Sequence, residues 1–181
     1  MKRIFSSYKT LMVLVVILSC PNSVVLAGPA ESILIKENEQ TFEISVPVSN
    51  LVLVLPKANF NSALPPQREG SMASPRFFQF ADNTTGVGLS GWFEHARGFD
   101  GVKEPKPASV QGTRLIYENI VFGKVGDWDS VSYDVVFQSN RIPNIKAHLV
   151  RENTWIELHI SGTQHELIRD IIKSIQVQVK P

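Results

Sequence analysis

Cysteine is almost absent from this sequence: Cys20 is the single cysteine in 181 residues. A lone cysteine cannot close an intramolecular disulfide, and it cannot supply a zinc site built from several thiolates. We therefore expect the fold to be held together by packing alone. Cys20 also lies in a segment that has the features of an export signal.

Residues 1–27 resemble a signal peptide. Three basic residues fall within the first nine positions, and the apolar run "LMVLVVIL" follows at residues 11–18. That run is too short to span a bilayer, which favours a cleaved targeting segment over a transmembrane helix. We predict export of the remaining chain to the periplasm or beyond.

Two processing sites compete in this leader. The small residues of "VLA" predict cleavage after Ala27, and the alternative is a lipoprotein signal ending at Ser19, with Cys20 acylated and retained. Leu18 is bulky at a position where a lipobox prefers a small residue, and this favours the cut after Ala27. The exported protein is then periplasmic or secreted, whereas the alternative cut would make it a membrane-anchored lipoprotein.

A basic excess is also missing from the mature chain. Residues 28–181 keep fifteen basic and seventeen acidic side chains, a formal net charge of −2. Nucleic-acid-binding proteins carry clustered positive charge, so we expect no nucleic-acid partner. Contact with a membrane is expected only through export or Cys20 lipidation. The 154 residues correspond to one domain.

Apolar residues alternate with polar ones through most of residues 28–181, and this period of two predicts strands. One segment, 51–56, is apolar at every position and predicts a strand covered on both faces. Predicted turns at 82–86 and 126–127 divide the other strands. The expected strands are 32–36, 41–46, 51–56, 75–81, 86–96, 118–125, 128–138, 144–150, 154–161 and 175–179.

Helices are expected on this sheet. Thr163 and Glu166 have the spacing of a capping box, and apolar residues then recur at helical spacing to Ile175. A shorter helix could begin near Pro107. The sequence thus predicts an α+β fold: an antiparallel β-sheet with flanking helices, in a single domain at 28–181.

The stretch "GLSGW" at residues 88–92 nearly matches the G-x-S-x-G elbow of a hydrolase nucleophile. The elbow requires a second glycine where this chain has Trp92, and it requires a strand-to-helix turn. Ser90 instead lies within an alternating strand, which is typical of packing. We predict no catalytic residue here.

The tightest predicted hairpin has Glu152 and Asn153 as its two-residue loop. Arg151 then pairs with Thr154, and one sheet face carries five side chains. These are Lys146, His148, Trp155, Glu157 and His159.

Two further residues are predicted on that face. Asp134 on the preceding strand could lie beside His148, and Trp92 could share the face with Trp155 and form the rim of a ligand groove. A carboxylate beside imidazoles suits an acid–base pair or a metal site. The competing interpretation is a solvated sheet face carrying weak cross-strand ion pairs.

Several segments resemble small exported bacterial proteins. They are "LSGWFEHARGFDGV", "KVGDWDSVSYDVVF", "IKAHLVRENTWIELHISG" and "IRDIIKSIQV". The order of elements from Phe42 to Val179 is similar to the Mog1/PsbP-like α/β/α sandwich. That group contains a Ran-binding factor, a photosystem II subunit and secretion-effector chaperones, so the resemblance implies a non-enzymatic binding or accessory role. It assigns no site residue, and "TFEISVPVSN" departs from the group's usual first strand.

We therefore expect an exported, non-catalytic protein that binds an envelope protein or a small ligand through its sheet face or loops. We expect no cofactor and no metal. One alternative is a metal-dependent or acid–base enzyme that uses Asp134, His148, Glu157 and His159. Another is an immunity protein for a secreted toxin, which a toxin reading frame beside the gene would indicate.

Overall fold

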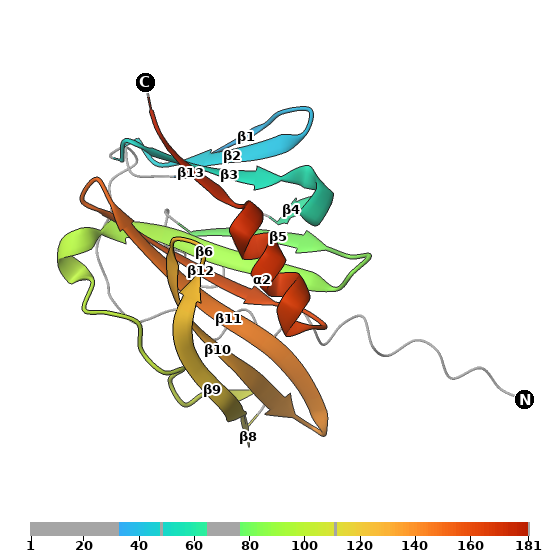
Figure 1. Cartoon of the computed structure of the whole chain (residues 1–181). Coiled ribbons are helices and arrows are strands. Elements are labelled where there is room, and N and C mark those ends of the chain that lie inside the picture. The colour runs from blue at the N-terminus through green and yellow to red at the C-terminus, as the bar shows by residue number, and fades with distance from the viewer. Residues whose placement is uncertain (1–32, 48, 65–76, 111, 181) are drawn as a thin grey trace, which may run out of the picture.

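The computed structural model describes residues 33–47, 49–64, 77–110 and 112–180. Both predicted processing sites, at Cys20 and at Ala27, lie outside these residues. Figure 1 shows the described chain as two β-sheets with a helix that lies against the larger one and leads into the last strand of the smaller one. Every strand pairing in these residues is antiparallel.

The larger sheet has seven strands. In spatial order these are β4 (Ser62–Leu64), β5 (Phe77–Asp82), β6 (Val87–His95), β12 (Thr154–Ser161), β11 (Asn140–Arg151), β10 (Trp128–Phe137) and β9 (Ile116–Val125). Of these, β12 joins the β5–β6 hairpin to the run of strands from β9 to β11. Its central position places β12 between β6 and β11, where the candidate site residues lie.

The smaller sheet has four strands in the order β1 (Leu34–Glu37), β2 (Thr41–Ser45), β3 (Leu51–Pro56) and β13 (Gln176–Val179). The remaining elements are the short pair β7 (Ser109–Val110) and β8 (Thr113–Arg114), the 3₁₀ turns η3 (Lys57–Asn59) and η5 (Ala96–Gly98), and the helix α2 (His165–Ser174).

One face of the larger sheet forms the main core. The buried rows of β2 and β3 and one stripe of α2 pack against this face and form a single apolar cluster with it. The members from the smaller sheet include Ile44 and Leu53, and those from α2 include Ile168 and Ile172. The predicted apolar stripe of the helix is confirmed. In β3 the residues are alternately buried and half-buried, so its expected coverage on both faces is wrong.

The expected α+β sandwich with flanking helices is wrong. The structure is 60% strand and 12% helical, with α2 as the one α-helix among the described residues. The cause is that the two strands within residues 41–56 belong to a second sheet, which covers the face where a helical layer was expected. Residues 101–108 form no regular element, so the short helix predicted near Pro107 is also absent from this described stretch.

The start of α2 also differs from the prediction. The helix begins at His165 with Gln164 as its N-cap residue, and no side chain caps it. Thr163 and Glu166 therefore do not form the predicted capping box. The N-terminus of the helix is held instead by a contact from His165 to the larger sheet.

Candidate functional site

The β11–β12 hairpin has the predicted register. Arg151 pairs with Thr154, His148 with Glu157 and Lys146 with His159. The loop residues Glu152 and Asn153 have φ values of 48° and 55°. Positive φ at both loop positions gives the backbone twist that a two-residue hairpin needs. The hairpin thus brings Lys146, His148, Trp155, Glu157 and His159 to one face.

The strand β6 adds Trp92 to this face. In the β6–β12 pairing, Trp92 is opposite Glu157 and Ser90 is opposite His159. Ser90 lies in the middle of a nine-residue strand and is buried, so it is not on the strand-to-helix turn of a nucleophile elbow. The placement of Trp92 with Trp155 on one face agrees with the prediction. We call the group Trp92, Lys146, His148, Trp155, Glu157 and His159 the polar cluster.

Four members of the polar cluster are buried and the other two, Lys146 and Trp155, are half-buried, so the interpretation as a solvated face is wrong. The exposed fractions are 1% for Glu157, 3% for His148 and 4% for His159. Residues 96–110, which we call the covering segment, run across this face from the end of β6 to β7 (Figure 1). Ala108 and Val110 pack with Val131, Tyr133 and Val135 of β10 in a second apolar cluster.

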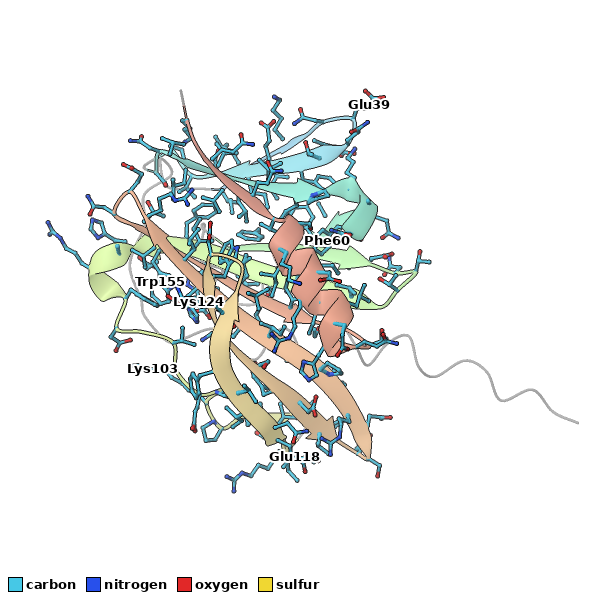
Figure 2. All side chains as sticks on the ribbon, viewed as in Figure 1. Glu39, Phe60, Lys103, Glu118, Lys124 and Trp155 are labelled. Carbon is cyan, nitrogen blue, oxygen red and sulfur yellow. The ribbon has the colours of Figure 1, made fainter. Side chains whose placement is uncertain are left out.

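Phe99 is the residue of the covering segment that contacts the polar cluster at Trp155 and His148. Its ring centroid is 5.3 Å from that of Trp155 and 5.6 Å from that of His148. Figure 2 places Trp155 near the end of the larger sheet where the chain leaves β6. Phe99 is not among the site residues predicted from the sequence. Its only signal is that it is a lone aromatic residue between Gly98 and Gly101 in a polar stretch.

Glu157 is a buried carboxyl with one close cation. Lys146 Nζ lies 2.7 Å from Glu157 Oε1, and the lysine side chain is 22% exposed. Burial raises the pKa of Glu157 to about 7, because desolvation penalises the carboxylate more than the attraction of Lys146 and Lys106 favours it. The carboxyl therefore exchanges its proton near neutral pH.

His148 is a neutral imidazole with a defined tautomer. The Trp155 indole Nε1 donates to His148 Nδ1 at 3.0 Å, so the imidazole proton is on Nε2. Burial, with a smaller effect from the charge of Lys146, lowers the pKa of His148 to about 3. The 3.4 Å contact from Nδ1 to Glu157 is therefore not an ion pair at neutral pH. Among the described residues, the buried Nε2 has no hydrogen-bond partner.

His159 is held by its neighbours and is part of the interior. Its Nε2 lies 3.0 Å from Asn144 Oδ1 and 3.0 Å from the Tyr133 hydroxyl. The Asn144 amide donates to the Ile142 carbonyl, which fixes the amide orientation, so Nε2 donates to Oδ1. Burial lowers the pKa of His159 to about 4. The histidine is neutral and positions Tyr133.

Asp134 lies on the opposite face of the sheet, so its predicted position beside His148 is wrong. In the β10–β11 pairing, Asp134 is opposite Pro143, and His148 is opposite Asp129. The register follows from the two-residue turn Gln138–Ser139, in which both residues have positive φ. The strands expected at 128–138 and 144–150 left a longer loop between them than the two residues that join β10 to β11.

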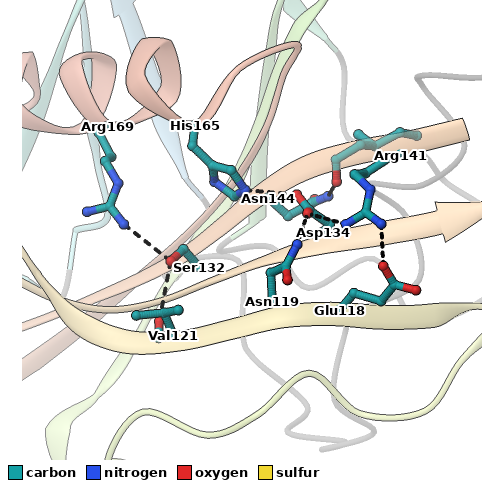
Figure 3. A network of polar contacts seen from close by, with 10 residues as sticks. Glu118, Asn119, Val121, Ser132, Asp134, Arg141, Asn144, His165 and Arg169 are labelled. Atoms are coloured by element: carbon teal, nitrogen blue, oxygen red, sulfur yellow. Dashed lines mark hydrogen bonds and ion pairs between the residues drawn. The ribbon is translucent and has the colours of Figure 1, made fainter.

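Asp134 binds the N-terminal end of α2 to the sheet, as Figure 3 shows. Its carboxylate accepts hydrogen bonds from Asn119 Nδ2 at 2.7 Å, Arg141 Nη1 at 2.8 Å and His165 Nε2 at 2.8 Å. Burial alone would raise the pKa of Asp134, but the hydrogen bonds from its partners outweigh burial and lower it. This network fixes the helix and does not reach the polar cluster.

The four residues expected to form an enzyme centre therefore do not converge. His148, Glu157 and His159 share the polar cluster, and Asp134 faces α2. Among the described residues, no group of three or more histidine, cysteine, aspartate or glutamate side chains has the geometry of a metal site. The arrangement brings together buried hydrogen-bonding groups, aromatic rings and a cation.

Comparison with known proteins supplies no family for this chain. No protein-family model and no curated protein matches it. In the described part of the chain, no helix is long and apolar enough to cross a membrane. Any functional conclusion therefore depends on the site itself.

Proposed function

We propose that this chain is an exported, non-catalytic binding protein that takes a small ligand at the polar cluster, beneath the covering segment. The observation that carries the proposal is the buried Nε2–H of His148, which has no hydrogen-bond acceptor among the described residues. A buried donor without an acceptor costs about 1–3 kcal/mol, and a ligand acceptor would recover that cost.

The chemistry of the polar cluster supports binding over a purely structural role. A packed sheet face is ordinarily filled with apolar side chains, as the opposite face is here. This face instead buries Glu157 and two histidines, each with a strongly shifted pKa. Such groups are costly to bury, and they concentrate at functional sites.

The covering segment supports a small ligand over a protein partner, because it already occupies the face. Among the described residues, no backbone–backbone hydrogen bond involves residues 100–107. A segment of this kind opens at lower cost than a strand, whose ladder of hydrogen bonds must break. A ligand can enter when the covering segment lifts and can be enclosed when it returns.

The leader supports export. Its basic start and apolar run have the pattern of a signal peptide. Mass spectrometry of the mature N-terminus tests this part of the proposal. A chain that begins at Gly28 is expected, an acylated Cys20 would place the protein on a membrane, and an intact Met1 would contradict export.

The binding proposal is tested by a thermal-shift screen of small metabolites against the purified mature protein. We expect one compound class to raise Tm for the wild type and to have little effect on His148→Phe, which keeps a ring and removes the donor. Gln178→Met is the matched control, because it removes a side-chain donor that is exposed on β13 of the smaller sheet. Equal shifts for the wild type and both variants would contradict the proposal.

A further inference from the structure

Phe99 contacts the ring of His148 but cannot form a hydrogen bond with it. The Phe99 ring lies against His148 and Trp155 and supplies aromatic contact to both. It has no atom that can accept a hydrogen bond, and the Nε2–H of His148 has no partner among the described residues. A ring that also carried an acceptor would supply both interactions at the same place.

The charge around this position indicates the acceptor. Lys146 on β11 is ion-paired with Glu157, and Lys106 on the covering segment also attracts that carboxyl. Asp129 on β10 is paired with Lys124 at 2.9 Å and is half exposed. Glu94 on β6 lies opposite Trp155 on the same face, so the two lysines are not an excess of positive charge. What favours an anionic acceptor is the neighbouring pair of groups on β11, the Lys146 cation and the Nε2–H donor of His148.

We infer that Phe99 is an internal competitor for the ligand, and that the ligand is a small aromatic carboxylate. The ligand ring takes the place of Phe99 against Trp155 and His148, and its carboxylate accepts from His148 Nε2 and from Lys146. The inference rests on the proposed binding function and names the ligand class for the same site.

The local chain allows Phe99 to leave. Gly98 and Gly101 flank it, and an added Cβ at either glycine would have no neighbour within 4 Å. Gly101 has a φ of 96°, a conformation that favours glycine. Backbone rotation at these two positions can move the ring away while β6 stays paired with β12.

Benzoate is the probe that tests this inference, by calorimetric titration of the full mature protein. We expect saturable binding to the wild type and binding about tenfold tighter to Phe99→Ala, because the competing ring is removed. Phe99→Leu keeps an apolar side chain without the ring and gives a second reading if the alanine variant is poorly folded. Phe122→Ala is the matched control, because Phe122 is exposed on β9.

Three comparisons separate a specific site from a simple cavity. Cyclohexanecarboxylate lacks the planar ring, benzamide lacks the charge, and toluene lacks the acceptor. We expect each to bind Phe99→Ala at least about tenfold more weakly than benzoate, and we expect His148→Phe in the same background to abolish the preference for benzoate. Toluene binding as tightly as benzoate would show an adventitious cavity and would overturn the inference.

The two experiments also distinguish failure of the proposed ligand class from failure of the proposed binding function. Absence of benzoate binding to both Phe99 variants overturns the ligand class. If the thermal-shift screen still yields a compound whose effect requires His148, the binding function stands with a different ligand. If the screen also yields none, both proposals fail.

Discussion

Trp155 and His148 are joined by a hydrogen bond of 3.0 Å from the indole Nε1 to the imidazole Nδ1. This contact determines which imidazole nitrogen carries the proton. It also leaves the donor at Nε2 facing a buried environment. The binding proposal begins from this relationship between two residues on neighbouring strands.

Nitrogen NMR of the imidazole rings checks the tautomer directly. We expect His148 to be protonated at Nε2 alone at pH 7 and to stay neutral at pH 5, because burial lowers its pKa to about 3. His159 behaves in the same way, with a pKa of about 4. His95, which is exposed, provides the reference signal. An Nδ1–H tautomer, or a charged His148 at pH 5, would contradict the geometry.

Glu157→Gln changes the pH dependence of stability. The folded pKa of Glu157, about 7, lies above its ordinary value of 4.5, so the folded state holds the proton more tightly than the unfolded state. Glu157 therefore lowers the free energy of unfolding of the wild type progressively as the pH rises from about 4.5 to 7. We expect Glu157→Gln to gain about 2 kcal/mol relative to the wild type between pH 5 and pH 8.

Urea unfolding at the two pH values measures this change. The buried histidines contribute equally to both proteins, so their terms cancel in the difference. Glu166→Gln alters an exposed carboxyl of α2 and should leave the difference between the two pH values as in the wild type. If the difference in the free energy of unfolding between the wild type and Glu157→Gln is the same at pH 5 and pH 8, Glu157 is ionised at both pH values and the prediction is wrong.

Asp134→Asn weakens the attachment of α2. The substitution removes the charge that Arg141 and His165 contact, in a carboxylate whose side chain is 6% exposed. We expect a loss of about 2 kcal/mol in the free energy of unfolding at pH 7. Because the pKa of Asp134 is lowered in the fold, this contribution is present above the unfolded pKa and is lost as the pH falls.

Hydrogen exchange of the α2 amides checks where this loss acts. Faster exchange in α2 than in β6 and β12 is expected for Asp134→Asn. Asp170→Asn removes an exposed partner of Lys173 in the same helix and is the matched control. Equal effects of the two substitutions would mean that the buried network adds little to the helix attachment.

Gly91→Ala tests the packing role of the glycine-rich stretch. A Cβ at Gly91 would lie 2.5 Å from the Phe78 ring and 2.6 Å from the backbone oxygen of Glu157. The backbone oxygen cannot move without disturbing β12, so we expect a loss of about 2 kcal/mol in thermal or urea unfolding. Gly123→Ala on β9 meets nothing within 4 Å and should cost far less. Comparable losses would argue against the close contact.

The sequence predicted the strand register within one hairpin better than it predicted how the sheets and the helix are layered. The loop at Glu152 and Asn153 determined the β11–β12 register, because a two-residue turn between alternating segments leaves one pairing. At the next hairpin, β11 extends through Pro143 to Asn140, beyond the strand expected at 144–150. A strand tolerates proline where its missing N–H is not needed in the ladder, and the resulting two-residue turn moved Asp134 to the other face.

Burial of the polar cluster could not be predicted from alternation. A strand pattern shows which residues share a face, but it does not show what lies over that face. The covering segment is polar and contains Pro105 and Pro107, so nothing in its composition indicated that Phe99 and Val110 pack onto the larger sheet. The fold class was wrong for a related reason, since residues 41–56 form their own layer.

Native mass spectrometry of the mature protein, purified from the cell envelope without exchange of its ligand, tests the central claim most directly. We expect a small-molecule adduct on the wild type and on Gln178→Met, and no adduct on His148→Phe. The same adduct on all three proteins, or no adduct on any of them, would contradict a binding site at the polar cluster.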